Sequence, residues 1–383
     1  MTKRLAFFVD SLAGGGAERV MLNLANEYVK QGYDVDLILA RKEGDYLSDV
    51  DSNIRIIDLA VTRFWTYFVP LVKYFKSEKP DVFLSATTIL NLLAIMTKSL
   101  SFSRTHLVVS EHIDIVSFAK QGALQRPALV KKLIALLYPK ANQIVAVSNG
   151  AAMSLSEFSG IPRTQIKAVY NGVIDSHKLA LAKEALDHPW FGVAQEGQPV
   201  IVAVGRLQAQ KDYPMLLRSF ALVLKQRPAK LIILGEGELR EELERLIDEL
   251  KVSEHVSLHG FELNPFKFFA NANVFALSSQ YEGLPTVLIE ALACGCPVVS
   301  TDCPSGPQEI LEKGKFGALV SVGDEKGFAE ALLSVLGLQE GSRQDLAQLK
   351  DDLMAHGKRF NVDNAFNEYS KVLGLVTNIN TEQ

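Results

Sequence analysis

The sequence contains little cysteine and no long apolar run. Its 383 residues include only Cys294, Cys296 and Cys303, and no histidine follows them at zinc-ligand spacing. An odd number of clustered thiols is a poor disulfide framework, so we expect small buried residues in a reducing compartment. No stretch approaches the roughly 18 apolar residues of a membrane span, and the first apolar run is too short for a signal peptide. These features predict a cytoplasmic protein.

Acidic residues are missing from one long segment. The chain has 40 Lys and Arg against 44 Asp and Glu, a net charge of −4. Residues 1–175 hold 20 basic and 16 acidic residues, a balance of +4, which leaves −8 for residues 176–383. From Ile115 to Ser156 there is no acidic residue, although five basic residues occur there. A one-sided basic surface indicates an anionic partner.

Apolar strands alternate with amphipathic helices along most of the chain. We predict buried strands at residues 4–10, 34–40, 81–86, 106–112, 143–149, 199–207, 230–237, 255–261, 272–279, 297–302 and 317–322. Continuous Val, Ile and Leu strands separated by helices are typical of parallel sheets covered on both faces. The predicted fold is α/β, with two doubly wound domains facing across a cleft. Their expected bounds are 1–175 and 198–360, joined by a linker at 176–197 and followed by a C-terminal helix at 361–383 that returns to the first domain.

The glycine loop after the first strand departs from a dinucleotide fingerprint. That fingerprint requires G-x-G-x-x-G, but Gly14, Gly15 and Gly16 are followed by Arg19 where the third glycine belongs. Arg41 follows the second strand, where an acidic residue would bind ribose. A dehydrogenase is therefore disfavoured. The glycines favour a loop that lets a ligand approach the backbone at a helix start, and a plain turn is the structural alternative.

Two Asp-x-Asp sequences, at residues 34–36 and 49–51, are candidates for metal ligands. The first opens a predicted strand at its amino end, which is the wrong edge for a ligand in a parallel sheet. The second lies in a polar loop. We interpret both as structural, and we expect no metal.

Charged residues follow three other predicted strands. His112 comes directly after the strand that ends near residue 111, although a single histidine is as often structural as catalytic. Arg206 and Lys211 follow the first strand of the second series. Two fixed cations at one strand end suit a pyrophosphate, because Arg offers a planar fork and Lys a point charge. Solvated surface charges are the alternative for this pair.

The stretch YEGLPTVLIEAL (281–292) places two glutamates in an apolar segment. Pro285 fits the first position of a helix, and no capping side chain precedes it. The amides of Thr286 and Val287 are then available to an anion. Glu290 shares their helix face and is placed to accept from hydroxyl groups, whereas Glu282 lies outside the helix and faces the ligand. Residues 305–307 repeat this arrangement with Ser-Gly-Pro.

These motifs resemble those of the family 4 glycosyltransferases. The resemblance rests on GGGAE (14–18), SEH (110–112), GRLQAQKD (205–212) and the Glu-x7-Glu region at 281–310, and it covers most of the chain. It implies the two-domain B-type fold, GT-B, with two Rossmann-like domains. It also implies anomer-retaining, metal-independent transfer from a nucleotide-activated sugar, without a cofactor.

The resemblance also assigns roles to residues. By motif match, Arg206 and Lys211 would hold the donor diphosphate, and Glu290 would bind the ribose hydroxyls. Glu282 would contact the donor sugar, and His112 would lie near the reacting centre. The remaining donor-binding positions are Gly15, Gly16, Gly283, Leu284, Pro285, Thr286 and Val287.

Within the family, the motifs are most similar to bacterial enzymes that extend lipid-linked oligosaccharides or surface polysaccharides. Such enzymes use UDP-sugars, so a UDP-linked N-acetylhexosamine or hexose is the implied donor and a glycan the acceptor; no nucleic acid is expected. The basic segment at 115–156 and the aromatic segment at 63–76 suggest peripheral contact with an anionic membrane on its inner face. Core-facing helices with solvated lysines are the alternative. A nucleotide-sugar epimerase and a non-catalytic glycan-binding protein remain as rival functions.

Overall fold

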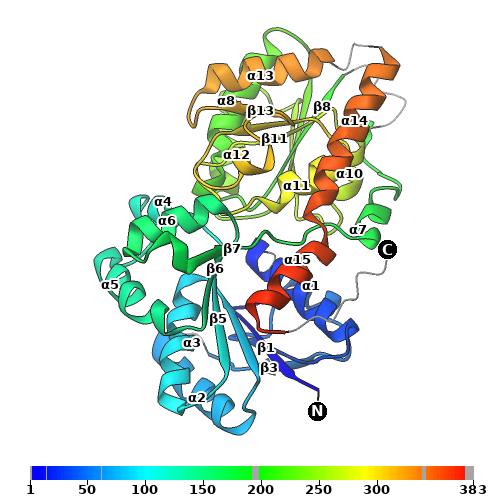
Figure 1. The fold of residues 1–383 in the computed structure, drawn as a ribbon. Helices are drawn as coiled ribbons and strands as arrows, with labels where there is room; N and C mark the ends of the chain where they lie inside the picture. Colours follow the sequence, from blue (N-terminus) through cyan, green and yellow to red (C-terminus); the bar gives the residue numbers. More distant parts are fainter. Residues whose placement is uncertain (1, 14, 62, 192–197, 339–341, 376–383) are drawn as a thin grey trace. The chain divides into compact units, whose positions relative to one another are not determined.

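Two parallel β-sheets organise the chain, one in each of two units (Figure 1). The computed structural model describes residues 2–13, 15–61, 63–191, 198–338 and 342–375. Unit 1 comprises Met1–Val173 with Val362–Gln383, and unit 2 comprises Ile174–Asn361. The predicted linker at 176–197 includes a short helix, and residues 192–197 lie outside the described residues. Within the described residues, no helix is both long and apolar enough to cross a membrane.

The unit 1 sheet has seven parallel strands in the order β3-β2-β1-β4-β5-β6-β7. The strands are β1 Arg4–Val9, β2 Asp34–Leu39, β3 Arg55–Asp58, β4 Val82–Ala86, β5 His106–Glu111, β6 Gln143–Ala146 and β7 Ile166–Ala168. The five strands predicted for this half of the chain are present. β3 and β7 were not predicted, because each is a short edge strand that lacks the continuous apolar run of a central strand.

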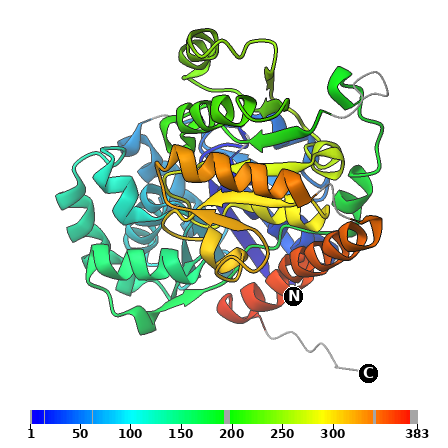
Figure 2. The same ribbon diagram turned by 90° about the horizontal axis from the view of Figure 1, so that it is seen from above.

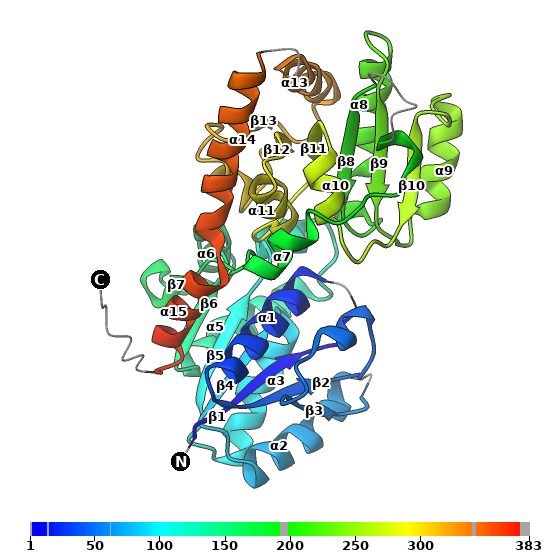
Figure 3. The same ribbon diagram turned by 90° about the vertical axis from the view of Figure 1, so that its right-hand side faces the viewer.

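Two groups of helices cover the opposite faces of this sheet (Figures 1 and 3). The unit 1 helices are α1 Gly16–Lys30, α2 Phe68–Ser77, α3 Thr88–Ser101, α4 Ile115–Lys120, α5 Pro127–Leu137, α6 Asn149–Ser159 and α15 Val362–Val372. Successive strand residues point to opposite faces. Phe7 packs on Tyr28 of α1, with ring centroids 5.8 Å apart, whereas Phe8 packs on Phe83, which in turn contacts Phe75 of α2.

The last described helix, α15, completes the unit 1 core. Its Phe366 ring lies 4.7 Å from the ring of Tyr28, and the Tyr28 hydroxyl lies 3.0 Å from Ser370 Oγ. His106 Nε2 lies 3.0 Å from the carbonyl oxygen of Val372. The buried aromatic contacts explain why this segment packs beside α1 although it is far away in sequence. Residues 376–383 of the predicted C-terminal helix lie outside the described residues.

The unit 2 sheet has six parallel strands in the order β10-β9-β8-β11-β12-β13, all of them predicted. They are β8 Val200–Val204, β9 Lys230–Leu234, β10 Val256–Gly260, β11 Val274–Leu277, β12 Val298–Thr301 and β13 Ala318–Val320. Its helices are α7 Ser176–Leu181, α8 Tyr213–Leu224, α9 Arg240–Glu249, α10 Phe266–Asn271, α11 Thr286–Ala293, α12 Pro307–Ile310, α13 Glu325–Leu338 and α14 Arg343–Gly357. α13 lies beside α8 on one face (Figure 2). The strand order places β8, β11 and β12 next to one another, so their carboxyl ends converge.

Helices α11 and α14 pack closely because glycine stands at their contact. A Cβ atom added to Gly357, the last residue of α14, would lie 2.5 Å from the Ala293 backbone nitrogen and 2.7 Å from its Cα. Backbone atoms cannot give way as a flexible side chain can. By contrast, a Cβ atom added to Gly337 in α13 would meet nothing within 4 Å.

We therefore expect Gly357→Ala and Gly337→Ala to change the stability of unit 2 in opposite directions. Overpacking at Gly357 should lower the free energy of unfolding by about 1–3 kcal/mol. The control Gly337→Ala should raise it by about 0.5–1 kcal/mol, because alanine loses less backbone entropy in a helix. The measurement is urea unfolding followed by the fluorescence of Trp190 in a Trp65→Phe background, since the chain has two tryptophans. Equal destabilisation by both substitutions would contradict this account of the contact.

Candidate active site

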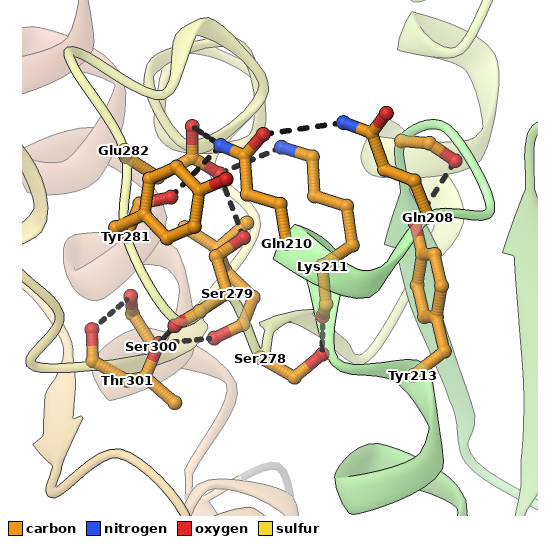
Figure 4. Close-up of polar contacts among 12 residues, drawn as sticks. Gln208, Gln210, Lys211, Tyr213, Ser278, Ser279, Tyr281, Glu282, Ser300 and Thr301 are labelled. Carbon is orange, nitrogen blue, oxygen red and sulfur yellow. Dashed lines mark hydrogen bonds and ion pairs between the residues drawn. The ribbon is translucent and has the colours of Figure 1, made fainter. Parts of the chain in front are cut away.

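The polar groups of unit 2 gather at the carboxyl ends of β8, β11 and β12 (Figure 4). The loop after β8 contributes Arg206, Gln210 and Lys211, and the loop after β11 runs from Ser278 to Pro285. Ser278 Oγ donates to the Lys211 carbonyl oxygen at 2.6 Å, and the Gln280 amide donates to the Gln210 carbonyl oxygen at 2.8 Å. The two loops are therefore joined through their backbones as well as through side chains.

Lys211 and Glu282 form a buried ion pair, which the sequence did not predict. Lys211 Nζ donates to Glu282 Oε1 at 2.6 Å, and the two side chains are only 14% and 9% exposed. A charge-assisted contact in a poorly solvated site is stronger than one on the surface. The two residues assigned separately to diphosphate and sugar thus lie in direct contact.

Neighbouring polar groups hold the Glu282 carboxylate in place. Ser279 Oγ donates to the same oxygen, Oε1, at 2.7 Å, while Gln210 Nε2 lies 3.5 Å from Oε2. Gln210 also donates to the Tyr281 carbonyl oxygen at 2.8 Å. Thr301, at the end of β12, donates to the Ser279 carbonyl oxygen at 2.6 Å. Oε1 therefore carries both short contacts, whereas Oε2 has only the longest one.

Two glycines after β9 make room for the loop that carries Arg206 and Lys211. A Cβ atom at Gly235 would lie 2.0 Å from the Gly205 carbonyl oxygen, and one at Gly237 would lie 2.4 Å from the Leu207 carbonyl oxygen. Gly235 also has a φ of +146°, which L side chains rarely adopt. These glycines were not predicted as site residues, although their G-x-G pattern directly after a strand was a usable signal.

Helix α11 starts one residue later than predicted. Pro285 occupies the N-cap position with an extended backbone, and the first helical residue is Thr286. No side chain caps this helix start, as predicted. The 305–306 turn packs against it, since a Cβ atom at Gly306 would lie 2.4 Å from Pro285 Cδ. The helix start follows Glu282 in the same loop, with Gly283, Leu284 and Pro285 between them and Val287 in the first turn.

The other two predicted donor-site residues of unit 2 have different surroundings. Arg206 is exposed on the loop after β8. Glu290 is 8% exposed on α11. Burial of the Cys294 thiol, and to a lesser extent the nearby charge of Glu290, raises the pKa of Cys294 to about 12. This makes Cys294 a neutral thiol at physiological pH rather than a reactive one.

In unit 1, His112 follows β5 directly, as predicted. Its Nε2 atom lies 3.0 Å from the hydroxyl of Ser110 on the same strand. Desolvation by the surrounding protein lowers the pKa of His112 to about 4, because burial disfavours the charged imidazolium. The ring is therefore neutral at pH 7 and can accept or donate one hydrogen bond at each nitrogen according to its tautomer.

The glycine loop of unit 1 leads directly into α1. Gly15 is the N-cap residue with an extended backbone, and no side chain caps the helix. A Cβ atom at Gly16 would meet nothing within 4 Å, so packing does not demand glycine there. Gly14 lies outside the described residues. Arg41, after β2, is paired with Asp10 at 2.9 Å and with Glu43 at 2.6 Å.

A buried carboxylate that was not predicted as a site residue directly precedes His112. Glu111 is 0% exposed and accepts from Tyr138, from Thr88 at 2.9 Å and from Asn91 at 3.1 Å. Burial raises the pKa of Glu111, although these hydrogen bonds oppose the shift. Thr87, at the end of the adjacent strand β4, has a φ of +76°. Such a backbone costs about 1–3 kcal/mol and persists only where the surroundings hold it.

The Asp-x-Asp pairs make structural contacts. Asp36 accepts from Arg55 at 2.7 and 2.8 Å and from the Tyr74 hydroxyl at 2.6 Å. Asp49 pairs with Arg19, whose guanidinium lies over the Tyr46 ring. Among the described residues, no group of three or more His, Cys, Asp and Glu side chains is arranged to hold a metal ion.

Solved structures with the same fold define the class of protein. The Anabaena protein HepE in complex with UDP-glucose has a TM-score of 0.79 at 19% identity, and the match covers 97% of this chain and 100% of HepE. The sucrose-phosphate synthase of Thermosynechococcus elongatus has a TM-score of 0.81 at 18% identity, covering 97% and 98%. The fold is therefore that of the GT-B glycosyltransferases, with two parallel-sheet α/β domains.

Sequence comparison then identifies the family. Residues 14–177 match Glycosyltransferase Family 4, and residues 187–350 match Glycosyl transferases group 1. The chain is 33% identical over 348 residues to N-acetylgalactosamine-N,N'-diacetylbacillosaminyl-diphospho-undecaprenol 4-alpha-N-acetylgalactosaminyltransferase of Campylobacter jejuni, covering 87% of this chain and 90% of that protein. The chain belongs to the family 4 glycosyltransferases and is a glycosyltransferase.

The lowered pKa of His112 predicts how acid affects stability. The unfolded chain protonates this histidine near pH 6.5, whereas the folded protein does so only near pH 4. Between these values the unfolded state binds more protons, so the free energy of unfolding falls as the pH is lowered from about 6.5 towards 4. His112→Gln removes this titration, and its melting temperature should drop less than that of the wild type between pH 7 and pH 5. Identical drops would refute the shift.

Proposed function

We propose that this protein is a retaining, metal-independent glycosyltransferase. It would move an N-acetylhexosamine or hexose from a UDP-sugar to a lipid-linked oligosaccharide or polysaccharide-precursor acceptor. The observation that carries the proposal is the Lys211–Glu282 pair beside the uncapped start of α11, which places a cation, a carboxylate and a helix dipole at one sheet edge.

The names and titles of related proteins support the donor and acceptor classes. HepE was solved with UDP-glucose, which supports a uridine nucleotide donor. The similar C. jejuni enzyme transfers N-acetylgalactosamine to a diphospho-undecaprenol-linked glycan by its name. A second C. jejuni N-acetylgalactosaminyltransferase, also named for an undecaprenol-linked glycan, is 26% identical over 387 residues, 98% of this chain and 99% of that protein.

In the proposed mechanism, the donor diphosphate lies against Arg206, Lys211 and the amides at the start of α11, while Glu290 accepts from the ribose. Breaking the bond between the sugar and the diphosphate moves an electron pair onto the diphosphate oxygen. Cations and a helix N-terminus fixed in advance stabilise that charge without reorganisation. Binding would require Lys211 to share its proton donors between Glu282 and the phosphate, which an ammonium with three donors allows.

Glu282 and His112 are assigned to the sugar. Glu282 Oε2 has the weaker of the two sets of contacts, so it is the oxygen left to accept from a sugar hydroxyl. The neutral His112 ring would donate to or accept from the sugar near the reacting carbon. Gly283 and Leu284 would contribute backbone amides, and the acceptor would approach along Gly15 and Gly16. An epimerase would require further acid–base groups at the sugar, and no observation favours that alternative.

The proposed acceptor class implies where in the cell the enzyme would work. A lipid-linked acceptor is embedded in a membrane, so the enzyme would work at the inner face of the cytoplasmic membrane through peripheral contact. The positive balance of the first 175 residues is consistent with an anionic lipid surface.

The proposal predicts the outcome of a donor panel with and without EDTA. Nucleotide release should require a lipid-linked acceptor, should be fastest with a UDP-sugar, and should be unchanged by the chelator. The measurement is UDP release alongside analysis of the glycan product. A requirement for divalent metal would contradict the assignment of Arg206 and Lys211, and an altered sugar released without acceptor would indicate epimerisation.

Two glutamine substitutions should separate the roles of the glutamates. Glu282→Gln should lower the transfer rate by about 10²–10³-fold, because it removes a contact at the reacting sugar. It should keep or strengthen UDP binding, since Lys211 loses its competing carboxylate. Glu290→Gln is the matched control, with weaker UDP binding because it lies at the ribose end. Calorimetric titration with UDP and initial rates provide both readouts, and unchanged turnover in Glu282→Gln would exclude its role.

A further inference from the structure

Three helices of unit 1, α2, α3 and α5, contain no acidic residue. α3 lies between α2 and α5 and contacts both, so together they form one layer over the sheet (Figure 1). Their sequences are FVPLVKYFKS, TILNLLAIMTKSLS and PALVKKLIALL. We call the outward side of this layer the acid-free face. By contrast, α1 on the opposite side of the sheet carries Glu18 and Glu27.

The acid-free face contains an apolar groove between α2 and α3. Its volume is about 630 Å³, and its walls are formed by Phe68, Val69, Val72 and Leu100, with Lys73 and Lys76 also lining it. Neither lysine forms an ion pair with a described residue. The groove therefore combines an apolar surface with free positive charge.

Large apolar side chains stand exposed around the groove. Trp65 and Val69 are each 77% exposed, Leu100 is 56% exposed, and Phe102, directly after α3, is 90% exposed. Packing on the sheet does not account for them, because α2 already covers it with the buried side chains of Leu71 and Phe75. Exposed apolar groups gathered in one place mark an interaction surface.

Helix α5 extends the same surface. Its inward face buries Val130 and Ile134, while Leu129 and Leu136 on the outward face are 48% and 64% exposed. The exposed Lys131 and Lys132 stand between those leucines in the sequence. The pattern of apolar groups with interspersed lysines is the same as at the groove, one helix further along the layer.

We infer that the acid-free face binds the surface of an anionic lipid bilayer. This inference rests on the proposed membrane contact and specifies which face of unit 1 makes it. Trp65, Val69 and Phe102 would enter the interface between headgroups and acyl chains, where amphipathic aromatic rings are stable. Lys73, Lys76, Lys131 and Lys132 would lie at the level of the lipid phosphates.

The charge of the acid-free face favours a lipid bilayer over a second copy of the chain as its binding partner. A two-fold contact places the same patch on both partners. It would bring the lysines of two acid-free helix layers together with no carboxylate on these helices to neutralise them. A bilayer rich in anionic lipid supplies both the missing negative charge and the apolar phase.

The inference is tested with full-length protein and sedimented vesicles of phosphatidylcholine, with or without phosphatidylglycerol. The variant Lys73→Glu/Lys76→Glu should reduce binding to anionic vesicles on the order of tenfold or more. Trp65→Ser/Val69→Ser should reduce binding at high salt, where the charge contribution is screened. Lys225→Glu/Lys251→Glu in unit 2 is the matched control, because it makes the same change of net charge at exposed lysines. Thermal melting at wild-type temperature establishes that each variant is folded.

The possible outcomes distinguish the role of the acid-free face from the proposed membrane contact and from self-association. Wild-type binding that requires anionic lipid and is lost only in the acid-free-face variants supports the inference. Equal binding by these variants and the wild type overturns it while leaving the proposed membrane contact in place. No binding of the wild type to either vesicle overturns the membrane contact itself. A concentration-dependent dimer that Trp65→Ser/Val69→Ser disrupts, without vesicle binding, assigns the face to self-association instead. Transfer to a detergent-dispersed lipid-linked acceptor tests the catalytic proposal separately.

Discussion

The contact between Lys211 and Glu282 joins the two loops on which the unit 2 site depends. One loop follows β8 and the other follows β11. Lys211 Nζ of the first loop lies 2.6 Å from Glu282 Oε1 of the second. A buried charge without a partner would be costly, so each residue stabilises the other. The same arrangement leaves the lysine in place for an incoming anion. Under the proposed function, donor binding would be an exchange of partners around one ammonium group.

The loops can approach this closely because small residues keep the backbone compact. Gly235 and Gly237 leave space for the β8 loop, and Gly306 leaves space for the residues before α11. Glu111 and its three hydrogen-bond donors have a similar function in unit 1, where they fix the strand end next to His112. In both units, residues without an assigned chemical role fix the backbone that carries the proposed site residues.

Periodicity predicted the strands that carry long apolar runs. The residues assigned to the site from strand ends follow β5, β8 and β11 in the structure. β3 and β7 were not predicted, because the apolar periodicity of an edge strand of three or four residues is too short to distinguish it from a loop. The absent helix cap before Thr286 was predicted, although Pro285 proved to be the N-cap residue. The Lys211–Glu282 contact was not predicted, because it joins residues 71 positions apart and depends on the order of strands in the sheet. The sequence likewise did not predict the positive φ of Thr87, because glycine is the residue expected at such a backbone angle.

The path of the chain between its two units has a consequence for biosynthesis. The core of unit 1 includes Phe366 and Tyr369 of α15, which are made after the whole of unit 2. A growing chain therefore carries an unfinished unit 1 core, with the Tyr28 side of α1 uncovered, until α15 has been made. Unit 2, which is continuous in sequence, has all its residues earlier. The unit whose first residues are made first is thus completed only after the other unit has been made.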